Sequence, residues 1–147
     1  DIESHLRYQP HAGRMVEREI IAGHISGPGF KPEAENVVSV NGAQHGLTIT
    51  VMGMLRPGDV VAVDALTYPG FKVLAELYHL ELIAIPALAD GPDLSALEAL
   101  CQKRHVRALY TMPTLHNPLG WVLNNSQRKK IAGIARNCDL LIIEDTA

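Results

Sequence analysis

The chain has 147 residues, of which 47% are hydrophobic and 20% charged, a composition typical of a globular domain with an apolar core. Its formal net charge of −3, without a lysine or arginine stripe, excludes the basic surface that nucleic-acid binding requires. No apolar run is long enough to span a membrane and no signal peptide is present, so we expect a cytoplasmic protein with no membrane partner.

Hydrophobic spacing near the beginning of the chain predicts two helices and one strand. Apolar residues between His11 and Ile25 indicate a helix with one buried side. The β-branched run at 37–40 is typical of a strand, and the i, i+4, i+7, i+8 spacing over 47–55 indicates an amphipathic helix. The polar residues 1–10 are expected to be irregular.

The rest of the chain alternates apolar runs with helical patterns. The expected strands cover residues 60–63, 82–85, 106–110 and 140–143, and the expected helices are 68–79, a helix capped by Asp93 and a helix capped by Ser126. Strands alternating with helices favour a parallel sheet covered on both faces. We therefore predict an α/β fold of three layers, αβα, with a mostly parallel sheet. Cys101 and Cys138 lack metal-ligand spacing and are expected to be reduced, half-buried helix residues.

The stretch from Tyr110 to Gly120 is the most promising place for a site. It follows an expected buried strand and runs about 14 residues to the next helix, which is long for a compact α/β domain. Ligands of open α/β sheets bind beyond the carboxyl ends of the strands. Asn117 offers one acceptor and two donors there, and it is the side chain that we expect to contact a ligand. His116 is a weaker candidate, because it could equally face solvent.

Three other segments follow expected strands and carry suitable groups. Gly42, Ala43 and Gln44 begin a helix, whose N–H groups and dipole favour an anion, although Gly42 alone also fits a tight turn. Tyr68 offers a ring for a planar ligand, although it also fits a half-buried packing residue. Asp145 ends an apolar strand and suits a basic partner, although it also fits an exposed acid.

Taken in order, these motifs resemble those of a known family. A glycine-led helix start, a tyrosine before Pro-Gly, Asn117-Pro118-Leu119-Gly120 and Ile142-Ile143-Glu144-Asp145 resemble the large domain of fold-type I pyridoxal-phosphate enzymes, the aminotransferase class I/II family. The phrases NGAQHGL, RPGDVVAVDALTYPGF, PTLHNPLG and IIEDTA are most similar to the aminotransferase-like domain of MocR-type regulators in the GntR family.

This resemblance implies a role for each candidate. Gly42, Ala43 and Gln44 would hold the phosphate of pyridoxal 5'-phosphate through backbone amides. Tyr68 would stack on the pyridine ring and Asn117 would hydrogen-bond its 3'-oxygen. Asp145 would pair with the pyridinium nitrogen, which makes the ring an electron sink.

The resemblance also implies what the chain lacks. The family's Schiff-base lysine lies well downstream of Asp145, beyond Ala147, so we expect this chain to be catalytically inactive by itself. Ala43 stands where many relatives have a serine, and Leu119 stands where threonine is commoner.

We expect residues 1–147 to be a fragment of the pyridoxal-phosphate-binding large domain, because the chain starts without methionine and ends directly after an expected strand. Our leading hypothesis is the effector domain of a MocR/GntR-type transcriptional regulator. Such a protein would bind an amino acid or amine, form a homodimer and contact DNA only through a domain absent from this chain. The alternatives are a piece of a free-standing class I/II aminotransferase and a non-catalytic α/β module that binds a nucleotide or a protein. No GxGxxG or P-loop motif supports nucleotide binding.

Overall fold

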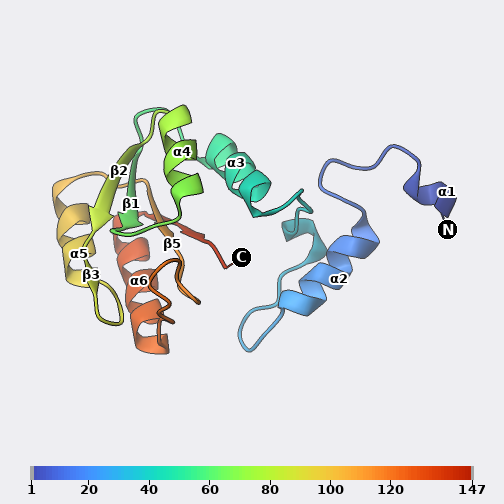
Figure 1. Cartoon of the computed structure of the whole chain (residues 1–147). Coiled ribbons are helices and arrows are strands. Elements are labelled where there is room, and N and C mark those ends of the chain that lie inside the picture. Colours follow the sequence, from blue (N-terminus) through green and yellow to red (C-terminus); the bar gives the residue numbers. More distant parts are fainter. Residues whose placement is uncertain (1, 147) are drawn as a thin grey trace. The chain divides into compact units, whose positions relative to one another are not determined.

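The computed structural model describes residues 2–146, so Asp1 and Ala147 lie outside the described residues. The chain divides into two compact units, one up to Gly46 and one from Leu47 onward. The first unit contains helices α1 (Ile2–His5) and α2 (Met15–Ile25), the 3-10 helix η1 (Ala34–Asn36) and the start of α3 (Ala43–Met54). The second contains the rest of α3 and then β1 (Val60–Asp64), α4 (Pro69–Leu77), β2 (Glu81–Ile85), β3 (Ala87–Leu88), β4 (Gly91–Pro92), α5 (Leu94–Lys103), β5 (Ala108–Thr111), α6 (Asn125–Cys138) and β6 (Leu141–Glu144) (Figure 1).

Helix α2 forms within the predicted range, but the expected buried side is wrong. Ala22 is its only buried residue among those described. The apolar residues that define its periodic face are all exposed: Met15, Val16, Ile20, Ile21 and Ile25. The short η1 packs against α2, and three residues are too few to cover an 11-residue helix.

Two further expectations for the first unit are wrong. Residues 37–40 form no strand, because their backbone bonds to other groups: the Ser39 N–H donates to the Ala12 carbonyl (2.9 Å), and the Arg18 side chain donates to the Val37 carbonyl (2.7 Å). Residues 1–10 are not wholly irregular, since α1 occupies Ile2–His5.

The main sheet has four parallel strands in the order β2-β1-β5-β6. It therefore has one strand fewer than expected, and a two-stranded antiparallel pair, β3-β4, accompanies it. The chain moves from β1 to β2 on one side and later to β5 on the other. The carboxyl ends of β1 and β5 thus form a topological switch point, where open α/β sheets bind ligands.

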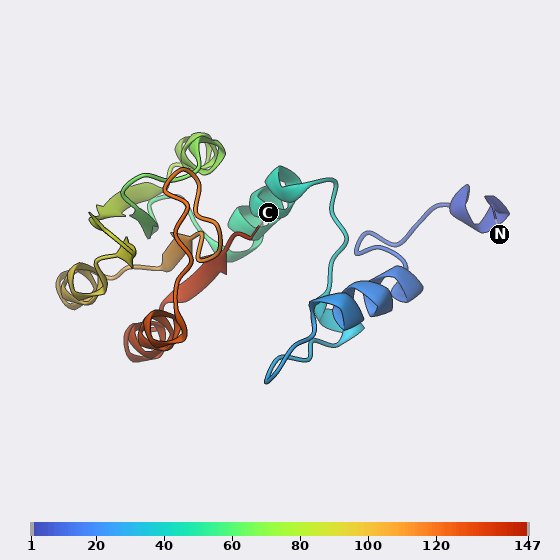
Figure 2. The same ribbon diagram turned by 60° about the horizontal axis from the view of Figure 1, so that its bottom comes forward.

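Helices cover both faces of this sheet, as predicted. Alternate strand residues point to opposite faces. Val61 and Val63 pack with side chains of α4 and of the later part of α3, whereas Ala62 packs with α5 and α6. Figure 2 shows the green helix α4 on one side of the strands and the yellow and orange-red helices α5 and α6 on the other. The predicted three-layer α/β fold is confirmed.

The helix starts of the second unit follow local chemistry. The predicted cap Asp93 is confirmed, because its carboxylate accepts from the N–H groups of Ser95 (2.9 Å) and Ala96 (3.0 Å). The predicted cap Ser126 is wrong. Asn124 caps α6 instead, in a reciprocal capping box with Gln127.

Two features predicted from composition can also be compared with the structure. Cys101 and Cys138 are free and half-buried in helices, as expected. Over residues 2–146, no helix has the length and apolar character needed to cross a membrane.

Candidate functional site

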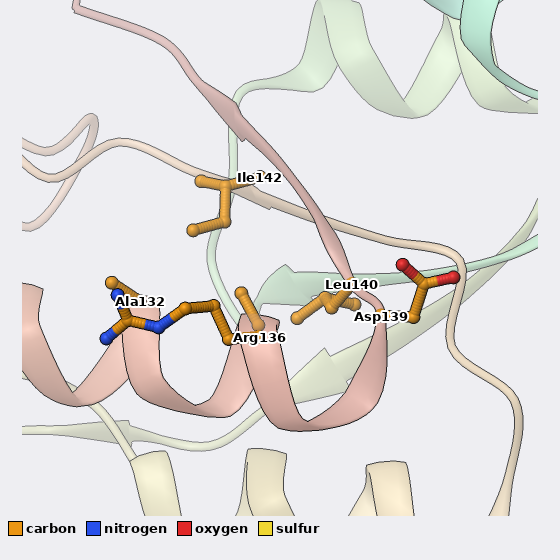
Figure 3. Close-up of a pocket in the computed structure, with 6 residues that line it drawn as sticks. Ala132, Arg136, Asp139, Leu140 and Ile142 are labelled. Carbon is orange, nitrogen blue, oxygen red and sulfur yellow. The ribbon is translucent and has the colours of Figure 1, made fainter.

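Two pockets lie beside the edge strands of the sheet. The larger, about 510 Å³, lies between α6 and the beginning of β6, with Arg136 and Ile142 among its lining residues (Figure 3). The other, about 340 Å³, lies along β2 and α5. Neither is lined by a predicted site residue, and the larger is at the opposite end of β6 from Asp145. The predicted site residues of the second unit lie instead beyond the carboxyl ends of the strands.

Asp145 directly follows β6 and is fixed by two contacts with β5. Its N–H donates to the Thr111 carbonyl (3.0 Å), which extends the β5-β6 pairing by one residue. Its Oδ2 accepts a hydrogen bond from the Tyr110 hydroxyl (2.7 Å). The carboxylate is half-buried. It is thus neither a fully exposed acid nor an isolated buried charge.

Tyr110 is fully buried and rigidly packed. Its ring stacks on that of Phe71 in α4, with the centroids 3.8 Å apart and the planes 2° from parallel. Burial raises the pKa of Tyr110, and the hydrogen bond and charge of Asp145 raise it further. Tyr68 and Asp64 add smaller effects in the same direction. The Tyr110 hydroxyl therefore keeps its proton and acts as a donor. The groups around it come from the ends of two other strands, β1 and β6, and from α4.

Tyr68 lies after β1, immediately before α4, and is half-buried. Its side chain lies against Gly70, where an added Cβ would overlap two carbons of the Tyr68 ring and its hydroxyl oxygen. The ring also packs against the apolar cluster that contains Tyr110. Gly70 therefore leaves the space that the Tyr68 ring occupies.

Asn117 is exposed in a tight loop after β5. The loop closes on itself: the His116 N–H donates to the Trp121 carbonyl (3.0 Å), and the Gly120 N–H donates to the His116 carbonyl (2.6 Å). Gly120 has a φ of +71°, a conformation that glycine adopts without strain. The Asn117–Pro118 peptide bond is cis.

His116 is a buried residue of this loop. It is 2% exposed, and its ring packs on Trp121 with the centroids 4.1 Å apart. Its Nδ1 accepts from the Leu119 N–H (3.3 Å), which in the neutral ring leaves the proton on Nε2. Nε2 lies 3.3 Å from Oδ2 of Asp64. The solvent-facing alternative for His116 is therefore wrong.

Asp64 is the last residue of β1 and is 0% exposed. Its Oδ2 accepts from the Thr111 hydroxyl (3.0 Å) and the Met112 N–H (3.3 Å). Burial raises the pKa of Asp64, and this effect outweighs the lowering by Thr111, Met112 and His116. These contacts join the ends of β1 and β5 at the switch point.

Arg128 in α6 connects the loop to the end of β6. Its guanidinium donates to the Pro113 carbonyl (3.1 Å) and the Thr114 hydroxyl (2.9 Å), and it pairs with Glu144 (3.3 Å). Glu144 is the residue before Asp145. Arg128 thus connects the loop that carries Asn117 to the end of β6, next to Asp145.

Gly42, Ala43 and Gln44 are exposed and lie at the start of α3, in the first unit. Gly42 has a φ of +86°, and an added Cβ would meet nothing within 4 Å, so glycine is required there by backbone conformation and not by space. Helix α3 has 12 residues, and its N-terminus carries the positive end of the helix dipole.

Within the second unit, three further residues make contacts near Tyr68, Asn117 and Asp145: Tyr110, Asp64 and Arg128. The sequence pattern did not single them out as site residues. Tyr110 ends an expected core strand, Asp64 directly follows another, and Arg128 has the pattern of a surface helix residue. A hydroxyl and a carboxylate inside buried strands were the available signals, because buried polar groups need partners.

The comparisons with known proteins identify the family. A sequence model described as "Aminotransferase class I and II" matches residues 1–147. An uncharacterized HTH-type transcriptional regulator of Bacillus subtilis, YdeF, is 27% identical over 147 residues, which are 100% of this chain and 32% of the regulator. The 2-aminoadipate transaminase of Thermus thermophilus is 30% identical over 142 residues, 97% of this chain and 34% of that enzyme. The chain thus spans about a third of the length of these relatives.

Solved structures give the same result. An archaeal alanine:glyoxylate aminotransferase superposes with a TM-score of 0.88 at 30% identity, covering 97% of this chain and 36% of that one. LysN of Thermus thermophilus, solved with N-(5'-phosphopyridoxyl)-L-leucine, has a TM-score of 0.87 at 29% identity, covering 97% of this chain and 35% of that one. The chain therefore belongs to the aminotransferase class I and II family.

Proposed function

We propose that this chain is a fragment of a pyridoxal-5'-phosphate-binding, aminotransferase-like domain, and that the complete protein is a MocR/GntR-type transcriptional regulator. Family membership supports the first part. HTH-type regulators of Bacillus subtilis and Escherichia coli that match 100% and 99% of this chain support the second. In this proposal the complete protein is cytoplasmic and homodimeric, and it contacts DNA through a segment outside residues 1–147.

The observation that carries the proposal is the way Asp145 is held. A carboxylate at a strand end, half-buried and oriented by a neutral hydroxyl, is suited to bind a protonated ring nitrogen. A carboxylate has about four acceptor positions, so it can accept hydrogen bonds from more than one donor. The Asp145 carboxylate is therefore a suitable acceptor for the protonated ring nitrogen of pyridoxal phosphate.

The other predicted residues would divide the remaining contacts. Asn117 presents an exposed carboxamide from a rigid loop and would hydrogen-bond the 3'-oxygen. The ring of Tyr68 would stack on the pyridine, and the backbone at Gly42, Ala43 and Gln44 would hold the phosphate at the start of α3. When bound, pyridoxal phosphate supplies an electron sink for the carbon next to an amino group.

An amino acid or amine is therefore the proposed ligand of the complete protein. The lysine that would hold the cofactor covalently is proposed to lie outside residues 1–147. This chain by itself is thus proposed to be inactive, and measurable transamination by the 147-residue chain would contradict that statement.

A free-standing aminotransferase is the second candidate for the complete protein. The match to the 2-aminoadipate transaminase of Thermus thermophilus, at 30% identity over 97% of this chain, favours it. The gene sequence upstream of codon 1 separates the two candidates. A basic helix-turn-helix segment there supports a regulator, and its absence from the complete gene supports an enzyme.

The test is a titration of the complete protein with pyridoxal phosphate, followed by the absorbance of the bound cofactor. We expect Asp145→Ala and Asn117→Ala each to weaken binding about tenfold or more and to change the spectrum. Asp90→Ala removes an exposed acid from the turn between β3 and β4 and serves as the control. Unchanged affinity and spectrum in both site variants would refute the proposal.

A further inference from the structure

We infer that Tyr110 is a positioning residue for the cofactor: its hydroxyl fixes the Asp145 carboxylate in the orientation that receives the ring nitrogen. This inference rests on the proposed function and adds a residue to it. The two groups are 35 residues apart in the sequence, and the hydroxyl lies 2.7 Å from Oδ2 of Asp145.

The Tyr110 side chain is held in one position by its surroundings. It is 0% exposed, so it cannot itself touch a ligand at the sheet edge. Stacking on Phe71 fixes the plane of the ring. The backbone of Tyr110 is fixed because β5 pairs with β1 and with β6. A rigid donor of this kind selects one rotamer of the half-buried carboxylate that it contacts.

The direction of the hydrogen bond matters. Burial raises the pKa of Tyr110, so the phenol keeps its proton near neutral pH. The phenol is therefore the donor and Asp145 the acceptor. A carboxylate that accepts from a neutral donor keeps its charge available for a cationic nitrogen. A hydrogen bond to a charged group is also about twice as strong as one between neutral groups.

The contact also connects two candidate residues. Phe71 is the third residue of α4, and Tyr68 caps the same helix. The stack of Phe71 on Tyr110 therefore joins the segment that carries Tyr68 to the hydroxyl that orients Asp145. Because Tyr110→Phe keeps the ring and this stack, it removes only the hydroxyl that contacts Asp145.

The experiment compares two probes in the complete protein with and without Tyr110→Phe. The probes are pyridoxal 5'-phosphate and 1-deazapyridoxal 5'-phosphate, which has a C–H group in place of the ring nitrogen. If Tyr110 acts through Asp145 on that nitrogen, Tyr110→Phe weakens pyridoxal phosphate binding about tenfold and leaves binding of the deaza probe within about twofold. A purely structural role would weaken both probes equally, and that result would overturn the inference.

The controls separate this inference from the proposed function. Equal affinity of the unsubstituted protein for both probes refutes the Asp145 contact itself, whereas a preference for pyridoxal phosphate that Tyr110→Phe does not reduce refutes only the role of Tyr110. Tyr78→Phe removes a hydroxyl from the other end of α4, next to the same apolar cluster, and we expect it to change neither affinity.

A second variant covers the case in which Tyr110→Phe does not fold. A fluorotyrosine at position 110 keeps the ring and its stacking on Phe71 but makes the hydroxyl a stronger donor. We expect the ratio of the two probe affinities to change. An unchanged ratio would contradict the inference.

Discussion

The two units of this chain use apolar residues in different ways. In the second unit, side chains of α5, such as Leu97, are fully enclosed by the sheet and by α6. In the first, α2 follows the same helical spacing, yet Ile20 is 67% exposed. Periodicity thus predicts that a helix forms and which side is apolar, but burial also needs a second surface large enough to cover it.

The largest expected effect is a direct test of this contrast. Leu97→Ala should lower the free energy of unfolding by about 2–5 kcal/mol, because it leaves a cavity in a closed core. Ile20→Ala removes an exposed side chain and should change it by about 0.5 kcal/mol or less. Urea unfolding of the two variants measures both values. Equal losses would mean that the α2 face is covered in solution.

Buried polar groups extend the comparison, since the second unit also encloses hydrogen bonds. Thr111→Val removes the hydroxyl that donates to Asp64 and should cost about 1–3 kcal/mol, because the carboxyl group stays buried. Thr67 provides a matched control: its buried hydroxyl has no hydrogen-bond partner among residues 2–146, so Thr67→Val should be neutral or stabilising. Chemical denaturation tests the pair. The reverse ranking would contradict the hydrogen-bond network described here.

The helix starts differ in the same way. Helix α6 begins with the capping box of Asn124, whereas Arg14, the residue before α2, makes no capping hydrogen bond with its side chain. Asn124→Ala should cost about 1 kcal/mol, and Asn125→Ala, one residue into the helix, should cost about 0.5 kcal/mol or less. Thermal unfolding of the two variants gives the comparison. A larger loss at Asn125 would place the cap elsewhere.

The smallest expected effect is a change in the free energy of unfolding with pH. Burial raises the pKa of Asp64 above its ordinary value of 3.8, so the folded state holds this proton more tightly than the unfolded state. The stability contributed by Asp64 is full below that value and is lost as the pH rises through the raised pKa. Stability relative to Asp64→Asn should therefore fall with rising pH. A constant difference would show that the pKa does not shift on folding, and a rising difference would show that it is lowered; either result would contradict the prediction. The same comparison is repeated with His116→Gln added to the unsubstituted protein and to Asp64→Asn, so that the neighbouring imidazole does not contribute to the slope.

Local chemistry explains which features could be predicted from the sequence. The Asp93 cap depends on residues two and three positions away, and the apolar strands β1, β2, β5 and β6 depend on their own composition. The run at 37–40 has the composition of a strand, but strand formation also requires a partner, and its backbone bonds to Ala12 and Arg18 instead.

The candidate site shows the same limit. Motif order was sufficient to select Tyr68, Asn117 and Asp145, because each follows a strand at the carboxyl edge. The contact of Tyr110 with Asp145 could not be predicted from the sequence. It depends on the pairing of β5 with β6, which brings together two residues 35 positions apart. The burial of His116 likewise depends on Asp64 at the end of another strand.

The most direct test of the central proposal is a crystal structure of the complete protein with pyridoxal phosphate. The expected result places the ring nitrogen about 2.7–2.9 Å from the Asp145 carboxylate, with Asn117 on the 3'-oxygen and the Tyr68 ring against the pyridine. Density for the cofactor at any other place, with Asp145 still bound only by protein groups, would contradict the account.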